Sequence, residues 1–243
     1  MSRNQTRFRG YKLLYENKTA TESMIRAAED FPHFFSIDRE FPLIIDCGAN
    51  IGVSVLEWKH RWPTCRVICF EPDPFAFELL EANIQKNDLP GVTAVCAAIS
   101  DRVGTSTLYG ELHHGADGRG NSLRPEWGQR DGTLQTDVPC VRLTAYLQDQ
   151  HVDFLKIDIE GMEEAVLKDA LPNLGNVDAA YIEVHGNNLL REDNARSRVE
   201  SILTGAGFLT ESESRFQPHA LPKHLRGWQQ RTNATQSQII CWR

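Results

Sequence analysis

The 243-residue chain lacks the features that mark several protein classes. It has no run of about eighteen apolar residues, so we expect no membrane-spanning segment. Residues 1–18 are polar and lack the apolar core of a secretion signal. No block of about five basic residues occurs, and 26 basic against 33 acidic residues give a net charge of −7. We therefore expect neither a membrane nor a nucleic acid as a partner.

Cysteines are present, but their spacing suits neither disulfides nor zinc. They form no Cys-x-x-Cys pair and show no spacing typical of zinc ligands. The six are Cys47, Cys65, Cys69, Cys96, Cys140 and Cys241. Several lie in apolar runs, where a thiol behaves as a small hydrophobic side chain. The simplest expectation is a reduced, cytoplasmic protein.

The remaining composition is that of a globular domain with two additions. Apolar residues make up 41% of the chain, enough for a sizeable core. Residues 1–40 are rich in charge and predict one or two short helices, which we interpret as an N-terminal helical cap on a main domain over 41–243. Residues 111–137 are polar and glycine-rich. A loop of this length in a compact domain is typical of a functional lid or of a disordered segment.

Strands and helices alternate from residue 43 onward. Short apolar runs of the kind that form buried parallel strands lie at 43–45, 66–70, 92–96, 152–157 and 179–184. Helical patterns follow at 51–61, 74–84, 162–170 and 192–206, and further strands are predicted at 138–143, 208–210 and 238–242. This alternation predicts an α/β fold with a doubly wound sheet. In such sheets the ligand lies beyond the carboxyl ends of the strands.

The turn after the first strand favours a ligand with an ammonium group. Its sequence is Asp-Cys-Gly-Ala-Asn-Ile-Gly over residues 46–52. Gly48 and Gly52 permit close approach of a ligand, and the following helix N-terminus offers N–H groups to a carboxylate. A dinucleotide motif needs glycine where Asn50 stands. Because Asp46 would repel a pyrophosphate, an NAD-dependent oxidoreductase is only a remote alternative.

Two further turns offer contacts for a nucleoside. Glu71, followed by Pro72, ends the second strand, where a carboxylate can accept hydrogen bonds from two ribose hydroxyls. Ile99, Ser100 and Asp101 follow the third strand and would supply an apolar surface and polar partners for an adenine ring.

Charged side chains alternate at the ends of the fourth and fifth core strands. Lys156, Asp158 and Glu160 fall on one side of their strand by its two-residue period, and Glu183 and His185 repeat the pattern. Charges in a core strand are costly unless they are paired or functional. We therefore expect a functional cluster here, with a purely structural ion-pair network as the alternative.

These segments together resemble the FkbM family of methyltransferases. The resemblance rests on the residue 46–52 motif, Phe-Glu-Pro at 70–72, the stretch 152–161 ending in Lys-Ile-Asp-Ile-Glu-Gly, and Ile-Glu-Val-His at 182–185. It implies a Rossmann-like class I sheet of seven mostly parallel strands with an antiparallel C-terminal hairpin. It also implies S-adenosylmethionine as methyl donor, S-adenosylhomocysteine as product, and a hydroxyl of a sugar or natural product as acceptor.

The resemblance and the strand-end positions assign roles to individual residues. The predicted cofactor contacts are Asp46, Cys47, Gly48, Ala49, Asn50, Gly52, Glu71, Pro72, Ile99, Ser100, Asp101 and Asp158. His185 is the first candidate for the general base, because its ordinary pKa lies near neutrality, and Asp158 is the second. Glu183 would orient His185 or the substrate, and Lys156 would orient Asp158.

Two alternatives stay open beside this assignment. In one, Asp158, Glu160, Glu183 and His185 hold a divalent metal that lowers the pKa of the acceptor hydroxyl. We rank it second, because the Asp-Asn pair of catechol methyltransferases is missing. In the other, a non-catalytic binding protein keeps the cofactor fold. Trp127 and Trp228 suit a core, a lid or a homodimer interface equally.

Overall fold

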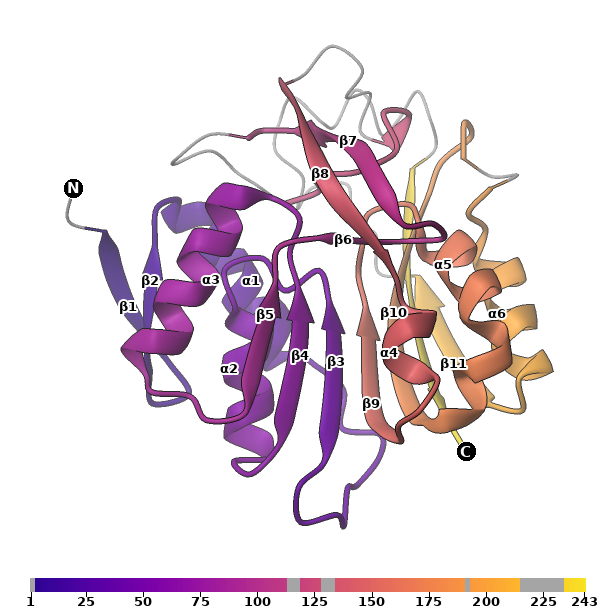
Figure 1. Cartoon of the computed structure of the whole chain (residues 1–243), viewed down its shortest axis with the longest axis horizontal. Helices are drawn as coiled ribbons and strands as arrows, with labels where there is room; N and C mark the ends of the chain where they lie inside the picture. Colours follow the sequence, from indigo (N-terminus) through magenta and orange to yellow (C-terminus); the bar gives the residue numbers. More distant parts are fainter. Residues whose placement is uncertain (1–2, 113–118, 128–133, 191–192, 215–233) are drawn as a thin grey trace.

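A seven-stranded sheet forms the centre of the computed structural model, which describes residues 3–112, 119–127, 134–190, 193–214 and 234–243 (Figure 1). The strand order is β11-β12-β10-β9-β3-β4-β5. The strands are β3 (Leu43–Cys47), β4 (Arg66–Phe70), β5 (Val92–Val95), β9 (Val152–Ile157), β10 (Val177–Gly186), β11 (Leu209–Ser214) and β12 (Thr235–Trp242). The first five run parallel, and β12 pairs antiparallel with both β10 and β11. The predicted doubly wound sheet with a closing antiparallel hairpin is confirmed.

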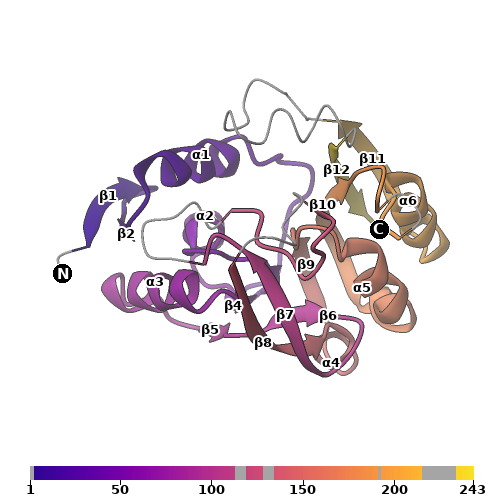
Figure 2. The ribbon, with the colours of Figure 1, turned by 90° about the horizontal axis from the view of Figure 1, so that it is seen from above.

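Helices cover both faces of this sheet (Figure 2). One face carries α1 (Lys18–Glu29), α2 (Val53–Arg61) and α3 (Pro74–Lys86). The other carries α4 (Thr144–Leu147), α5 (Glu163–Ala170), the 3₁₀ helix over Leu171–Asn176, and α6 (Arg196–Gly205). A separate hydrophobic cluster fills the space on each face. The carboxyl ends of the parallel strands are left uncovered by these helices, which is where a ligand site is expected.

Residues 1–40 differ from the predicted helical cap. Helix α1 is present, but an antiparallel hairpin of β1 (Asn4–Phe8) and β2 (Tyr11–Tyr15) precedes it. Its two-residue turn is Arg9-Gly10, with φ of 50° and 89°. Such turns need positive φ at both positions, and Asn-Gly or Asp-Gly is their usual signal. One predicted helix is thus present, but the hairpin was not predicted, because Arg at the first position hides the turn.

A second, three-stranded sheet was not predicted. Its strands are β6 (Ala98–Ser100), β7 (Gly104–Gly110) and β8 (Leu134–Arg142), in the order β6-β8-β7. It lies beyond the carboxyl ends of the parallel strands (Figure 1). The predicted lid over 111–137 is therefore shorter, because residues 134–137 belong to β8. Residues 113–118 and 128–133 of that segment, and Trp228, lie outside the described residues.

Helix α6 begins later than the predicted residue 192. Residues 191–192 lie outside the described residues, and the backbone N–H groups of Asp193 and Asn194 donate to Leu190 in a turn. All six cysteines are free thiols. Among the described residues, no helix is long and apolar enough to cross a membrane.

Asn83 of α3 and Asn87, the cap at its C-terminal end, attach the N-terminal hairpin to the main domain. The Asn83 amide accepts from Leu14 N at 2.6 Å and donates to Leu14 O at 3.1 Å and Ile51 O at 2.8 Å. One turn later, the Asn87 amide pairs with both Lys12 N and Lys12 O. Each amide forms the backbone hydrogen bonds with β2 that a neighbouring strand would otherwise form. Asn83 is buried whereas Asn87 is half-buried, so the hydrogen bonds of Asn83 are better shielded from water than those of Asn87.

Asn83→Ala should lower the free energy of unfolding by about 2–4 kcal/mol, because it leaves buried N–H and C=O groups without partners. Asn87→Ala is the matched control, and its loss should be about 1 kcal/mol or less because water can replace the amide. Urea unfolding followed by circular dichroism measures both. Equal shifts in the two variants would contradict this account of the docking.

Candidate active site

The ends of β3, β4 and β9 are joined by backbone hydrogen bonds at one edge of the sheet. Gly48 N and Ala49 N both donate to Phe70 O, at 3.0 and 2.9 Å, and Asp158 N donates to Cys47 O at 3.1 Å. The loops that follow the three strands therefore have fixed positions relative to one another.

Gly48 is the closest point between the first loop and the end of β9. Its φ is +85°, and a Cβ built there would lie 1.9 Å from the Asp158 carbonyl oxygen. No side chain fits at that distance, so only glycine permits this approach. We predicted glycine here because it permits close approach of a ligand. The close approach of the Asp158 carbonyl requires glycine as well.

Glu71 joins the first loop to the loop after β4. Its carboxylate accepts from Asn50 N and from Asp73 N, each at 2.8 Å. Burial raises the pKa of Glu71 to about 8, and the nearby Asp73 carboxylate adds to the rise, although the two backbone N–H groups oppose it. Two oxygens offer about four lone-pair directions, so acceptor capacity is left for hydroxyl groups.

Asp46 is fully buried behind the first loop. It accepts from Trp58 Nε1 at 2.7 Å, and its other oxygen lies 3.3 Å from Lys156 Nζ. Direct contact with a ligand ammonium, as predicted, does not fit this position, because the carboxylate faces protein on all sides. The Cys47 side chain is also buried, in the hydrophobic core.

Lys156 connects the first loop with the end of β9. Its ammonium lies 3.3 Å from Asp46 and 3.4 Å from Asp158, and it donates to Gly48 O at 3.0 Å. Burial alone would lower the pKa of Lys156, but Asp46, Asp158 and Glu183 together raise it above its ordinary value. Lys156 is therefore a permanent cation.

His185 lies among three carboxylates. Its Nδ1 lies 2.9 Å from Glu163 Oε1, and its Nε2 lies 3.5 Å from Glu160 Oε2 and 3.9 Å from Asp158 Oδ1. Burial alone would lower the pKa of His185, but the three carboxylates raise it well above the ordinary value. The predicted residues of both strand ends do converge, and Asp158, Glu160 and His185 each place one polar atom within 4.8 Å of the others.

Glu163 is the main residue that the sequence analysis missed. It is fully buried, accepts from Gly161 N and Asn194 Nδ2, and fixes the His185 ring. We interpreted the surrounding helix only by its apolar face. The available signal was an acid in the first turn of α5, where a carboxylate can accept from backbone N–H groups.

Trp127 and Ser122, both from the predicted lid, hold Glu160. Trp127 Nε1 donates to Glu160 Oε2 at 2.6 Å, and Ser122 Oγ donates to Glu160 O. Glu160 has φ +55°, an uncommon value for a residue other than glycine, which these contacts and the following Gly161 stabilise. The Trp127 ring meets His185 edge-on with centroids 5.2 Å apart. Trp127 is therefore a core residue of the site.

The remaining predicted residues are less closely joined. Glu183 accepts from the Tyr181 hydroxyl at 3.3 Å, and burial, followed by the charge of Asp158, raises its pKa to about 8. Ile99 and Ser100 are buried in β6, and Asp101 is exposed. The prediction of an adenine surface at these three residues remains a prediction.

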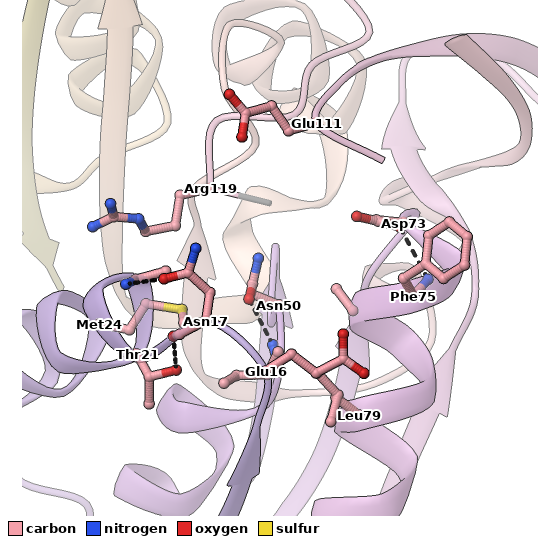
Figure 3. Close-up of a pocket in the computed structure, with 13 residues that line it drawn as sticks. Glu16, Asn17, Thr21, Met24, Asn50, Asp73, Phe75, Leu79, Glu111 and Arg119 are labelled. Atoms are coloured by element: carbon pink, nitrogen blue, oxygen red, sulfur yellow. Dashed lines mark hydrogen bonds between the residues drawn. The ribbon is translucent and has the colours of Figure 1, made fainter. Parts of the chain in front are cut away.

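A pocket opens beside the first loop, between α1 and α3 (Figure 3). Met24, Phe75 and Leu79 give it apolar walls, while Asn50 and Arg119 line it with polar groups. Residues of the N-terminal cap and of the predicted lid thus line one pocket together with the glycine loop.

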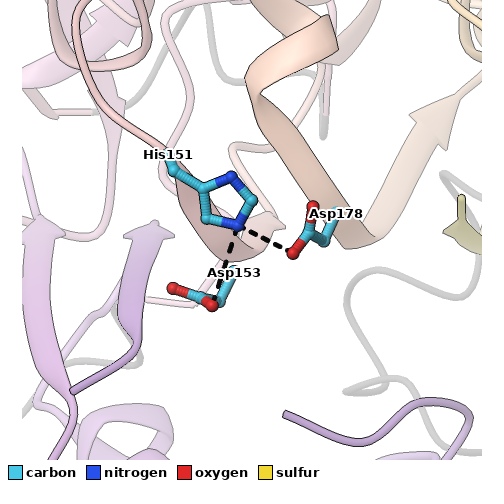
Figure 4. Close-up of side chains that lie close together, drawn as sticks. All are labelled: His151, Asp153 and Asp178. Atoms are coloured by element: carbon cyan, nitrogen blue, oxygen red, sulfur yellow. Dashed lines mark hydrogen bonds and ion pairs between the residues drawn. The ribbon is translucent and has the colours of Figure 1, made fainter. Parts of the chain in front are cut away.

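A second group of titratable side chains lies at the opposite ends of β9 and β10 (Figure 4). His151 Nε2 lies 2.8 Å from Asp178 Oδ2 and 3.8 Å from Asp153 Oδ1. Asp153 also accepts from Leu43 N at 2.8 Å and lies 3.0 Å from Arg39 Nε. This group pairs charges at the starts of the strands, away from the candidate site.

Known proteins resemble this chain in both sequence and fold. Methyltransferase sdnD of Sordaria araneosa is 29% identical over 210 residues, which cover 73% of this chain and 78% of that protein. The 31-O-demethyl-FK506 methyltransferase FkbM of Streptomyces tacrolimicus is 30% identical over 202 residues, or 70% and 74% of the two chains. The crystal structure of a methyltransferase FkbM from Methylobacillus flagellatus KT gives a TM-score of 0.56 at 15% identity over 88% of this chain. This chain spans 46% of that crystallised protein.

The model of the methyltransferase FkbM domain matches residues 46–210. That range includes the glycine loop, Glu71, and the charged ends of β9 and β10. The resemblance seen in the sequence is confirmed, and this chain belongs to the FkbM family of methyltransferases.

Proposed function

We propose that this protein transfers the methyl group of S-adenosylmethionine to a hydroxyl oxygen of a small molecule. The observation that carries the proposal is the position of Lys156, which contacts both the glycine loop and Asp158. A methyl donor at that loop would lie beside the strand-end carboxylates. The family and the oxygen acceptor named for the Streptomyces relative support the choice of reaction. The cytoplasmic location remains a prediction.

The cofactor is proposed to lie along the first loop and Glu71. Gly48, Ala49 and Asn50 would face its methionine part, and the Glu71 carboxylate would accept hydrogen bonds from the ribose hydroxyls. Glu71 already fixes the Asn50 and Asp73 backbone, so the acid would shape the loop and hold the ribose with the same two oxygens.

The methyl transfer itself is an in-line displacement. A lone pair of the acceptor oxygen forms the new C–O bond, and the C–S bond breaks with its electron pair remaining on sulfur, which yields S-adenosylhomocysteine. The protein has to align oxygen, carbon and sulfur and to accept the hydroxyl proton. That proton would pass to the carboxylates at the strand ends.

Asp158 is the group of this cluster that an acceptor hydroxyl meets first. Its side chain is 28% exposed, against 3% for His185. His185 lies behind it, oriented by Glu163. Of the two predicted bases, the geometry thus favours Asp158 for direct contact with the acceptor. His185 would stabilise the negative charge of the carboxylates from behind.

The acceptor is proposed to be selected by residues 1–40 and the lid. The pocket of Figure 3 supports this, because Asn17 and Met24 come from the cap side whereas Glu111 and Arg119 come from the lid segment. Neither region carries the residues proposed for the chemistry.

Calorimetry should detect S-adenosylhomocysteine binding with a Kd on the order of micromolar, and no heat with NAD⁺. Glu71→Ala should weaken the binding at least tenfold, because the ribose would lose its acceptor and the loop its anchor. Glu81→Ala, an exposed acid of α3, is the matched control and should bind as wild type. Binding of NAD⁺ instead, or equal affinity in all three proteins, would contradict the cofactor assignment.

Asp158→Asn and His185→Ala should each lower turnover with a hydroxylated acceptor about 10²–10⁴-fold, the usual contribution of a positioned acid–base group. Turnover is measured as S-adenosylhomocysteine released with a panel of sugar and polyketide alcohols. His185→Ala should leave S-adenosylhomocysteine affinity within about threefold of wild type, since the ring does not face the glycine loop. Wild-type turnover in both variants would remove the strand-end cluster from the chemistry.

A further inference from the structure

Asp158, Glu160 and His185 have the composition and spacing of a metal-ligand set. Two carboxylates and one imidazole come together from the end of β9 and from β10. Two ligand atoms bound to one ion at about 2.0–2.2 Å lie roughly 3.0–3.9 Å apart, depending on the angle at the ion. His185 Nε2 lies 3.5 and 3.9 Å from the oxygens of Glu160 and Asp158, within this range.

Direct charged hydrogen bonds would be shorter than this. An imidazolium N–H bonded to a carboxylate has a separation of about 2.7–2.9 Å. His185 makes such a contact on its other side, where Nδ1 lies 2.9 Å from Glu163. On the Nε2 side, the Asp158 and Glu160 carboxylates lie beyond this distance. Glu160 Oε2 accepts a hydrogen bond from Trp127 Nε1 instead. The nearly fully buried ring thus points Nε2 into a gap between two anionic oxygens.

Glu163 holds the His185 ring in the way that an outer carboxylate holds a metal-binding histidine. A carboxylate that accepts from Nδ1–H leaves the lone pair of a neutral imidazole on Nε2. A bound ion would take the place of the Nε2 proton and lie between the Asp158 and Glu160 oxygens. Because Glu163 is itself buried and fixed by Gly161 N and Asn194, the ring orientation is set before any ion binds.

The local charges also leave room for a cation. Asp158, Glu160 and Glu183 gather at the two strand ends. Lys156 is their neighbouring fixed cation, and it already neutralises the buried Asp46. A divalent ion in place of the His185 Nε2 proton would bring more positive charge to these three carboxylates.

The group of Figure 4 shows the contrast. There, His151 Nε2 lies at hydrogen-bond distance, 2.8 Å, from Asp178, and the Arg39 guanidinium lies 3.0 Å from Asp153. The carboxylates of that group already have their cation, and its members satisfy one another directly. It serves as an internal control for non-specific binding of ions to acidic side chains.

We propose that Asp158, Glu160 and His185 bind one divalent cation of the Mn²⁺ type. An imidazole with two carboxylates suits a borderline ion better than Ca²⁺, which prefers oxygen ligands alone. The role of the ion rests on the proposed methyl transfer: it would bind the acceptor oxygen and lower the pKa of that hydroxyl. Its binding does not depend on that function.

Mn²⁺ binding to the full chain is measured by electron paramagnetic resonance, from the loss of the free-ion signal. We expect one saturable site per chain. Glu160→Gln and His185→Gln should weaken it at least tenfold, and Glu163→Gln should weaken it about 10–100-fold, the usual effect of losing an outer carboxylate. Asp178→Asn, in the control group, should bind as wild type. Absence of saturable binding, wild-type affinity in the Glu160 and His185 variants, or loss in Asp178→Asn would each overturn the proposal.

A second measurement uses the wild-type protein, so it does not depend on whether the variants fold. Electron spin-echo modulation from a coordinated imidazole nitrogen is expected for the bound Mn²⁺, and a spectrum with oxygen ligands alone would overturn the site. S-adenosylhomocysteine affinity, measured on the same samples, separates the two proposals. Mn²⁺ binding without S-adenosylhomocysteine binding would remove the proposed methyl transfer but not the metal site.

Discussion

The site is organised around the buried ammonium of Lys156. It lies between a fully buried carboxylate, Asp46, and a partly exposed one, Asp158, and it donates to the Gly48 carbonyl. Breaking a buried ion pair by removing one partner usually costs several kcal/mol, because the remaining charge stays in a low-dielectric interior. The end of β9 and the glycine loop therefore cannot separate without leaving Asp46 unpaired. The glycine loop and Asp158 thus take their relative position from this contact.

A second buried pair, Glu163 with His185, does the same for β10. Glu163 accepts from the turn at Gly161 and from Asn194, so the end of β9 and the helix after it are fixed to the ring of His185. In both pairs a basic group lies between carboxylates: the ammonium of Lys156 and the ring of His185. They explain why charged residues occur in core strands, since each has a buried partner.

The strand ends were predictable from the sequence because their signals are local. The charges at 156–160 and 183–185 show a two-residue period. Gly48 lies three residues after the apolar run 43–45, and Glu71 directly follows the run 66–70. Glu163 and Trp127 escaped prediction because their roles depend on contacts distant in sequence. Trp127 meets Glu160 across 33 positions, and Glu163 meets His185 across 22. The N-terminal hairpin was missed because only Gly10 of the Arg9-Gly10 turn is a residue that favours positive φ, and the short strand β6 has only three residues.

These constraints separate the chemistry from the choice of acceptor. Gly48 and Asp158 touch through backbone atoms, so the distance between the proposed cofactor loop and the cluster is fixed and cannot adapt to substrates of different size. The walls of the pocket can adapt, because Met24 belongs to a helix outside the central sheet and Arg119 belongs to the lid segment. Neither side chain is part of the ion pairs that hold the strand ends together. Substitutions there can change the shape of the pocket while the strand-end carboxylates and His185 keep their positions. Under the proposed function, acceptor preference would then diverge within this fold without a change in mechanism.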